Sequence, residues 1–154
     1  GETENNDLFF AYLGADALKN PAPLGFFRQF LVENDGEHKD TFDIKARGLV
    51  PLIDAARLLA IQCGIRHNDN TAYRFMKLAE KEPQNAAIFE ACAEAFLELL
   101  KFRTEEGLRN SSNGRYLNLS ELSKLDKVKL KNAFQPISEI QEIIKNRFQL
   151  TYFT

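Results

Sequence analysis

Tryptophan is absent from this 154-residue sequence, which also has only two cysteines, two histidines and one methionine. Metal centres in proteins need several ligands at close spacing, and neither histidine has such a partner. No apolar run approaches the roughly 20 residues that a membrane-spanning helix requires, and no signal peptide is visible. We therefore expect a protein without a bound metal and without a membrane contact.

Neither sign of charge dominates the chain. Lys and Arg number 20 against 22 Asp and Glu, so the net charge is −2. This balance provides no long-range attraction to nucleic acid or to anionic membranes. Apolar residues make up 44% and charged residues 27% of the chain, which is typical of a globular domain with a core. Thirteen phenylalanines indicate that this core is built on phenylalanine.

The few reactive side chains have ordinary structural interpretations. Cys63 and Cys92 both lie in apolar helical patterns. They could form a disulfide, but buried free thiols in a reducing cytoplasm are the favoured alternative. His38 and His67 lie in polar loops and are expected at the surface.

Motifs of catalysis are also lacking. The sequence has no glycine-rich phosphate loop, no GxGxxG, no HExxH and no serine in a nucleophile elbow. It also lacks the clustered carboxylates with which a polymerase-type nucleotidyltransferase holds magnesium on a triphosphate. We therefore do not expect this chain to catalyse a reaction alone or to carry a cofactor.

Helical periodicity covers most of the chain. The run Asn68, Asp69, Asn70 and Thr71 is predicted to supply the caps of the third helix, and Ser123 with Asp126 predicts a capping box. Pro83 should end one helix, and Pro136 should kink the last one. The predicted helices span about 7–20, 43 or 50 to 63, 72–82, 84–109 and 123–148.

These patterns predict an all-α fold, a bundle of four main helices with an extra N-terminal helix. A short segment of about 26–42, rich in aromatic residues around a glycine turn, is either a hairpin or irregular extended chain. We expect one domain over 1–154. Gly in place of Met at position 1 suggests a fragment of a larger protein.

The most informative stretch alternates charges within an apolar helix. At about 100° per residue, four charged side chains would point within roughly 80° of one another: Asp43, Arg47, Asp54 and Arg57. They could grip a nucleotide, because a guanidinium donates two hydrogen bonds to phosphate. Alternatively they form an intramolecular ion-pair network that sets the helix register. This argument weakens for Asp43 and Arg47 if Pro51 marks the helix start.

The same stretch has the form D-x-K-x-R-G-L-x-P-x-x-D-x-A-R and resembles a known family. Shorter segments continue the resemblance: 24–28, 35–39, 70–71, 96–103 and 130–134. The chain is similar to the putative nucleotidyltransferase substrate-binding domain, found at the end of bacterial proteins. Those proteins also carry a cyclic-nucleotide-binding-like domain, paired CBS domains and a nucleotidyltransferase-like domain.

The resemblance implies a helical bundle that helps to bind substrate or to position an upstream catalytic domain. The parent would resemble the uridylyltransferases that modify the nitrogen-signalling protein PII, and it would use magnesium and a nucleoside triphosphate. The alternative is an interaction or dimerisation module that relays the state of upstream regulatory domains. In either case the candidate substrate-binding or interdomain residues are Asp43, Lys45, Arg47, Asp54, Arg57, Arg103 and Lys131. The stem of Arg103 can pack while its head reaches an acid such as Asp54.

Overall fold

Helices make up most of the structure. The computed structural model describes residues 2–26, 28–66 and 70–148, with side chains from residue 7 onward. The α-helices are α1 (Glu2–Ala17), α2 (Val50–Gln62), α3 (Thr71–Lys81), α4 (Ala86–Asn110), α5 (Lys124–Ala133) and α6 (Gln135–Arg147). Shorter elements are strands β1 (Phe42–Asp43) and β2 (Tyr116–Leu117), the π-helical turn η1 (Lys45–Leu49) and the 3-10 turns η2 (Pro83–Asn85) and η3 (Leu119–Glu121). The predicted all-α fold class is confirmed.

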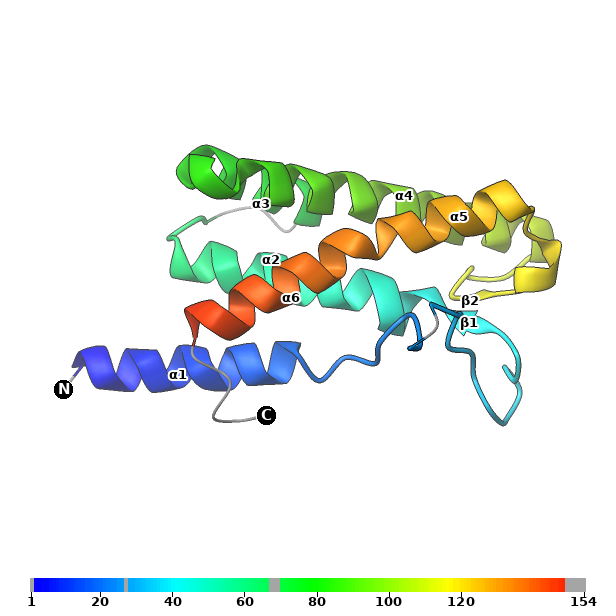
Figure 1. Ribbon diagram of the computed structural model, residues 1–154, viewed down its shortest axis with the longest axis horizontal. Coiled ribbons are helices and arrows are strands. Elements are labelled where there is room, and N and C mark those ends of the chain that lie inside the picture. The colour runs from blue at the N-terminus through cyan, green and yellow to red at the C-terminus, as the bar shows by residue number, and fades with distance from the viewer. Residues whose placement is uncertain (1, 27, 67–69, 149–154) are drawn as a thin grey trace.

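The helices pack side by side around one apolar core. Figure 1 shows α4 along one side of the bundle and α1 along the opposite side, with α2 and α6 between them. Helix α2 contacts α1, α3 and α6, and α4 contacts α3, α5 and α6. Phe42, Phe75 and Phe89 are fully buried, together with nine leucines and isoleucines that are just as inaccessible. The core therefore combines phenylalanine with aliphatic residues.

Helix α2 is extended upstream by the wider turn η1. In this turn the N–H of Val50 donates to the carbonyl of Lys45, five residues earlier. A proline ring in a regular α-helix clashes with the carbonyl four residues before it. Pro51 lies in the first turn of α2, directly after η1, a position where proline is tolerated. The α-helix therefore begins at Val50, the second of the two predicted starts, while η1 carries the helical path back to Lys45 and Asp43 lies in β1 rather than on the helix.

The last predicted helix is broken in two. Phe134 separates α5 from α6, and Pro136 occupies the first turn of α6, where its missing N–H costs nothing. The predicted kink at Pro136 is therefore a break two residues earlier. The predicted start is confirmed, because the Ser123 hydroxyl accepts a hydrogen bond from the Asp126 N–H at 3.0 Å.

The segment between α1 and β1 is irregular rather than a hairpin. Its backbone forms an isolated bridge between Leu24 and Phe30. Further along, the N–H of Glu33 donates to Thr41 and the N–H of Asp40 donates to Glu33, at 2.9 and 2.8 Å. Strand β1 pairs with β2, in antiparallel register, and not with this segment. Of the two predicted alternatives, irregular chain is therefore the observed one.

Other local predictions have different outcomes. The first helix spans Glu2–Ala17 rather than the predicted 7–20, so it ends before Asn20 and Pro21. The Asn70 side chain accepts from the Tyr73 N–H at 2.9 Å and caps α3, whereas His67 and the predicted caps Asn68 and Asp69 lie outside the described residues. Both cysteines are free, and burial raises the pKa of the Cys92 thiol to about 12.

Candidate functional site

Asp43 does not join the predicted ionic strip, because it pairs with an arginine from another part of the chain. Arg115 donates from Nε and Nη2 to the two carboxylate oxygens of Asp43, at 3.0 and 2.9 Å. The Ala46 N–H donates to the same carboxylate at 2.9 Å. Burial by itself would raise the pKa of Asp43, but the hydrogen bonds from Arg115 and Ala46 and the charges of Arg115 and Arg47 hold it below its usual value. Asp43 thus fastens β1 to the segment before β2.

We expect Asp43→Asn to lower the free energy of unfolding by about 2 kcal/mol at neutral pH. This loss is smaller than for a fully buried ion pair, because Arg115 is one-third exposed. Because folding lowers the pKa of Asp43, its stabilisation is complete above the unfolded pKa of about 3.9 and is lost as pH falls through the folded pKa. Urea unfolding of wild type and variant at a series of pH values measures this stabilisation. The difference between wild type and variant should be constant above about pH 5 and shrink on further acidification. A difference that grows in acid contradicts the assignment.

Arg47 faces the segment that follows α1. Its Nη1 donates to the carbonyl of Ala22 at 2.6 Å, and its Nη2 lies 3.4 Å from the Glu33 carboxylate. Its buried Nε has no hydrogen-bond partner among the residues that the structure describes. The side chain therefore fastens two points of the irregular 18–42 segment to the start of the α2 helix.

Asp54 supports the same segment about two helical turns further along. The Asn20 side-chain amide donates to Asp54 at 3.1 Å and to the Ala17 carbonyl at 2.9 Å. Asp54 and Arg57 also line a small hollow of about 120 Å³ between α1 and α2. Arg57 is exposed, and within the described chain no ion pair joins it to Asp54. The predicted strip is therefore not one ionic network.

Two further candidates point elsewhere. Lys45 is exposed on η1. Arg103 donates from Nε to the carbonyl of Asn113 at 3.0 Å, so it fastens the loop after α4 and does not reach Asp54.

Lys131 lines a groove of about 420 Å³. One wall is the 18–28 segment that Arg47 and Asp54 hold, and the other comes from residues 131–141 of α5 and α6. Arg28 is a second cation in this lining, and no carboxylate is among the described residues that line the groove. Three of the predicted residues therefore meet at this groove. Lys131 lines it, whereas Arg47 and Asp54 hold one of its walls through Ala22 and Asn20.

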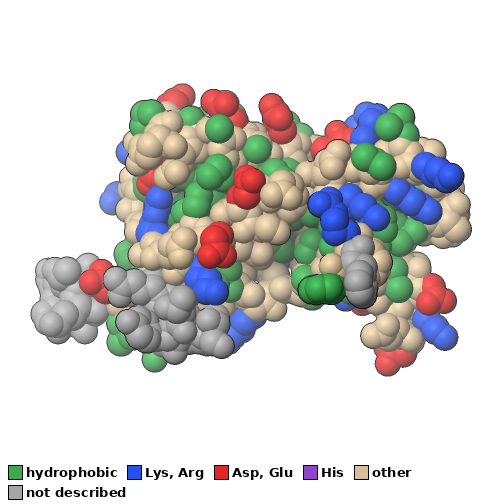
Figure 2. Space-filling view, in the orientation of Figure 1, with side chains coloured by type: hydrophobic (Ala, Val, Ile, Leu, Met, Phe, Trp, Pro, Cys, Tyr) green, Lys and Arg blue, Asp and Glu red, His purple; other side chains and the backbone are tan. Residues whose placement is uncertain are grey.

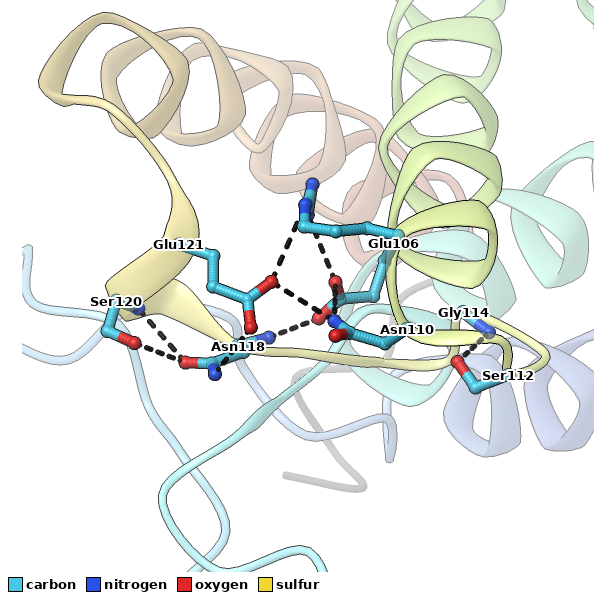
Figure 3. Close-up of polar contacts among 8 residues, drawn as sticks. Glu106, Asn110, Ser112, Gly114, Asn118, Ser120 and Glu121 are labelled. Carbon is cyan, nitrogen blue, oxygen red and sulfur yellow. Dashed lines mark hydrogen bonds and ion pairs between the residues drawn. The ribbon is translucent and has the colours of Figure 1, made fainter.

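A buried carboxylate, Glu106, organises the end of the molecule that carries β2. It is 2% exposed and accepts hydrogen bonds from the Arg109 guanidinium, the Asn110 amide and the Asn118 N–H (Figure 3). Glu121 reaches the same group, because it accepts from Asn110 at 3.1 Å. This polar network holds the loop that leads from α4 through β2 to η3.

Sequence reasoning missed Arg28, Arg115 and Glu106 as organising residues. Arg115 lies 72 positions from Asp43, so no local spacing links them. Arg28 stands inside the segment 24–28 that carries the family resemblance, and that segment could have marked it. Glu106 could have been noticed as a charge close to the apolar stripe of its helix.

Within residues 2–26, 28–66 and 70–148 there is no group of three or more His, Cys, Asp or Glu that could hold a metal ion. None of the described helices combines the length and apolarity that crossing a bilayer requires.

Comparison with known proteins identifies the family. Searches of curated proteins and of solved structures give no match. The family model described as "putative nucleotidyltransferase substrate binding domain" matches residues 7–148. That range contains the groove, its supports and all seven candidate residues. The chain therefore belongs to the nucleotidyltransferase substrate-binding domain family.

Proposed function

We propose that this chain is the accessory, substrate-binding domain of a bacterial signal-transduction protein similar to the uridylyltransferases of protein PII. The parent would act in the cytoplasm and would carry a nucleotidyltransferase-like domain, paired CBS domains and a cyclic-nucleotide-binding-like domain. Magnesium, the nucleoside triphosphate and the catalytic carboxylates would belong to the upstream domain. The family match supports the substrate-binding role.

The observation that carries this proposal is the groove between the 18–28 segment and α5–α6. Its volume of about 420 Å³ lies within the usual range of small-molecule sites. Arg47 and Asp54 hold one wall through Ala22 and Asn20, so they would act as positioning residues. Asp43, which is buried and bonded to Arg115, would likewise act by positioning. Candidates for contact with substrate or with the upstream domain remain Lys45, Arg57 and Arg103.

We expect the double substitution Arg47→Ala and Arg57→Ala to lower nucleotide transfer by the parent protein about tenfold. Without Arg47 the groove wall loses its bond at Ala22, and small displacements of a binding group are costly to catalysis. Steady-state transfer rates measure the effect, with circular dichroism as a check of folding. Arg66→Ala, at another exposed arginine, is the matched control. Transfer at the wild-type rate in the double variant would sink the proposed role of these residues.

The second candidate function is an interaction or dimerisation module. Exposed leucines form a stripe on one side of α4, where Leu97 is 57%, Leu100 36% and Leu108 80% exposed. Apolar patches of this kind often mark protein interfaces. Concentration-dependent self-association that Leu108→Glu abolishes, together with unchanged transfer in the arginine variant, would favour this alternative.

A further inference from the structure

The groove carries positive charge that none of the described carboxylates neutralises. Lys131 projects from α5, and Arg28 comes from the facing segment. Neither side chain forms an ion pair with a carboxylate in the described part of the chain. Figure 2 shows Lys and Arg side chains gathered over α5 on this face. Unpaired cations in a hollow without acidic residues attract an anionic ligand.

The Lys131 ammonium and the backbone of Arg28 are held in place before a ligand arrives. The Lys131 ammonium lies 5.1 Å from the centre of the Phe30 ring, a contact that restrains it without neutralising it. Arg28 has a φ of 60°, which is uncommon for any residue other than glycine. Two backbone hydrogen bonds of the turn, Gly25 to Gln29 and Arg28 to Gly25, maintain that conformation at 2.8 and 2.9 Å. Preorganised groups of this kind lower the entropic cost of binding.

The rest of the groove is uncharged. Helix α6 contributes Gln135, Ser138 and Gln141, which offer hydrogen-bond donors and acceptors, and Leu18 and Leu24 contribute apolar surface from the opposite wall. The site therefore combines a cationic part with a polar and apolar part. That combination suits a molecule with an anionic group attached to a larger uncharged body.

We propose that this groove binds a phosphate-bearing small molecule, with Lys131 and Arg28 on the phosphate oxygens and α6 on the uncharged remainder. Arginine suits phosphate because its planar fork donates two hydrogen bonds, and lysine serves as a point charge. The inference rests on the proposed substrate-binding function and adds the chemical class of its ligand.

Calorimetric titration of the 154-residue chain with pyrophosphate, ATP and adenosine tests this proposal. We expect saturable binding of pyrophosphate and ATP and much weaker binding of adenosine, which has no phosphate. Lys131→Glu and Arg28→Gly should each weaken ATP binding at least about tenfold, the usual effect of losing a charge-assisted hydrogen bond. Glycine adopts a positive φ without strain, so Arg28→Gly removes the charge while the turn is kept.

Lys129→Glu is the matched control, because Lys129 is exposed on the same helix, outside the groove lining. Equal weakening by Lys129→Glu and Lys131→Glu would reduce the effect to general charge and overturn the site. Absence of pyrophosphate and ATP binding at about 5 mM, far above typical substrate affinities, would overturn it as well. If the groove binds neither ligand while the Arg47 and Arg57 variant still impairs transfer, the proposed function stands and only the ligand class is wrong.

Discussion

Gly114→Ala is expected to lower the free energy of unfolding by about 3 kcal/mol or more. Gly114 has a φ of 74°, and a Cβ added there would lie 1.9 Å from the carbonyl oxygen of Arg103. This atom belongs to the backbone of α4 and cannot turn aside. The loop would have to move away from α4, which would pull Arg115 and β2 from their partners. Urea unfolding followed by circular dichroism measures the loss.

Gly36→Ala separates the two causes of that loss. Gly36 has nearly the same φ, 78°, but nothing lies within 4 Å of the position of its Cβ. It should therefore show only the cost of the left-handed conformation, about 1 kcal/mol. If the two variants lose equal stability, the close approach at Gly114 contributes nothing and the prediction is wrong.

Glu106→Ala is expected to cost about 2 to 4 kcal/mol of unfolding free energy. The substitution leaves the Asn118 N–H without its acceptor and removes one of the two acceptors of the Asn110 amide, which keeps Glu121; an unsatisfied polar group beside a buried position is costly. The Arg109 guanidinium contributes less to this cost, because its side chain is 35% exposed and Glu121 still lies 3.4 Å from its Nε. Thermal unfolding should show a lower midpoint, by about 2–4 °C for each kcal/mol in a domain of this size.

Two variants sharpen the test of Glu106. Glu106→Gln keeps an oxygen acceptor for the Asn118 N–H and should lose clearly less stability than Glu106→Ala. Glu105→Ala removes an exposed neighbour on the same helix and should change stability by no more than about 0.5 kcal/mol. An equal loss in the Gln and Ala variants would show that the charge, rather than the hydrogen bonds, stabilises this loop.

The features that sequence reasoning predicted correctly are those with local causes. Asn70 and Ser123 accept hydrogen bonds from N–H groups three residues ahead, so cap and partner are visible in one short stretch. Pro83 likewise acts on its immediate neighbours, and α3 ends before it. Pro51 was harder, because proline permits either a helix start or a distortion, and here α2 starts at Val50 directly after a π turn.

The ionic strip shows why a local angular argument is not sufficient. It assumed a regular 100° step through η1, whereas a π turn has more residues per turn. The angular argument also could not include the distant residues that bond to a charged side chain and fix its direction. Arg115 is 72 residues from Asp43, and Asn20 is 34 residues from Asp54.

By itself, the sequence determined the helical class, most helix boundaries, the lack of a recognisable catalytic motif and the family. These follow from composition, periodicity, capping residues and a long motif, all of which are properties of neighbouring residues. Only the tertiary structure decided that Arg47 and Asp54 support the segment after α1. It also decided that this segment and α5–α6 form a groove, which Lys131 and Arg28 line. Burial makes an unpaired polar group costly, so Asp43 and Arg47 are bonded to groups that packing brought near. Packing brings together residues that are far apart in the chain.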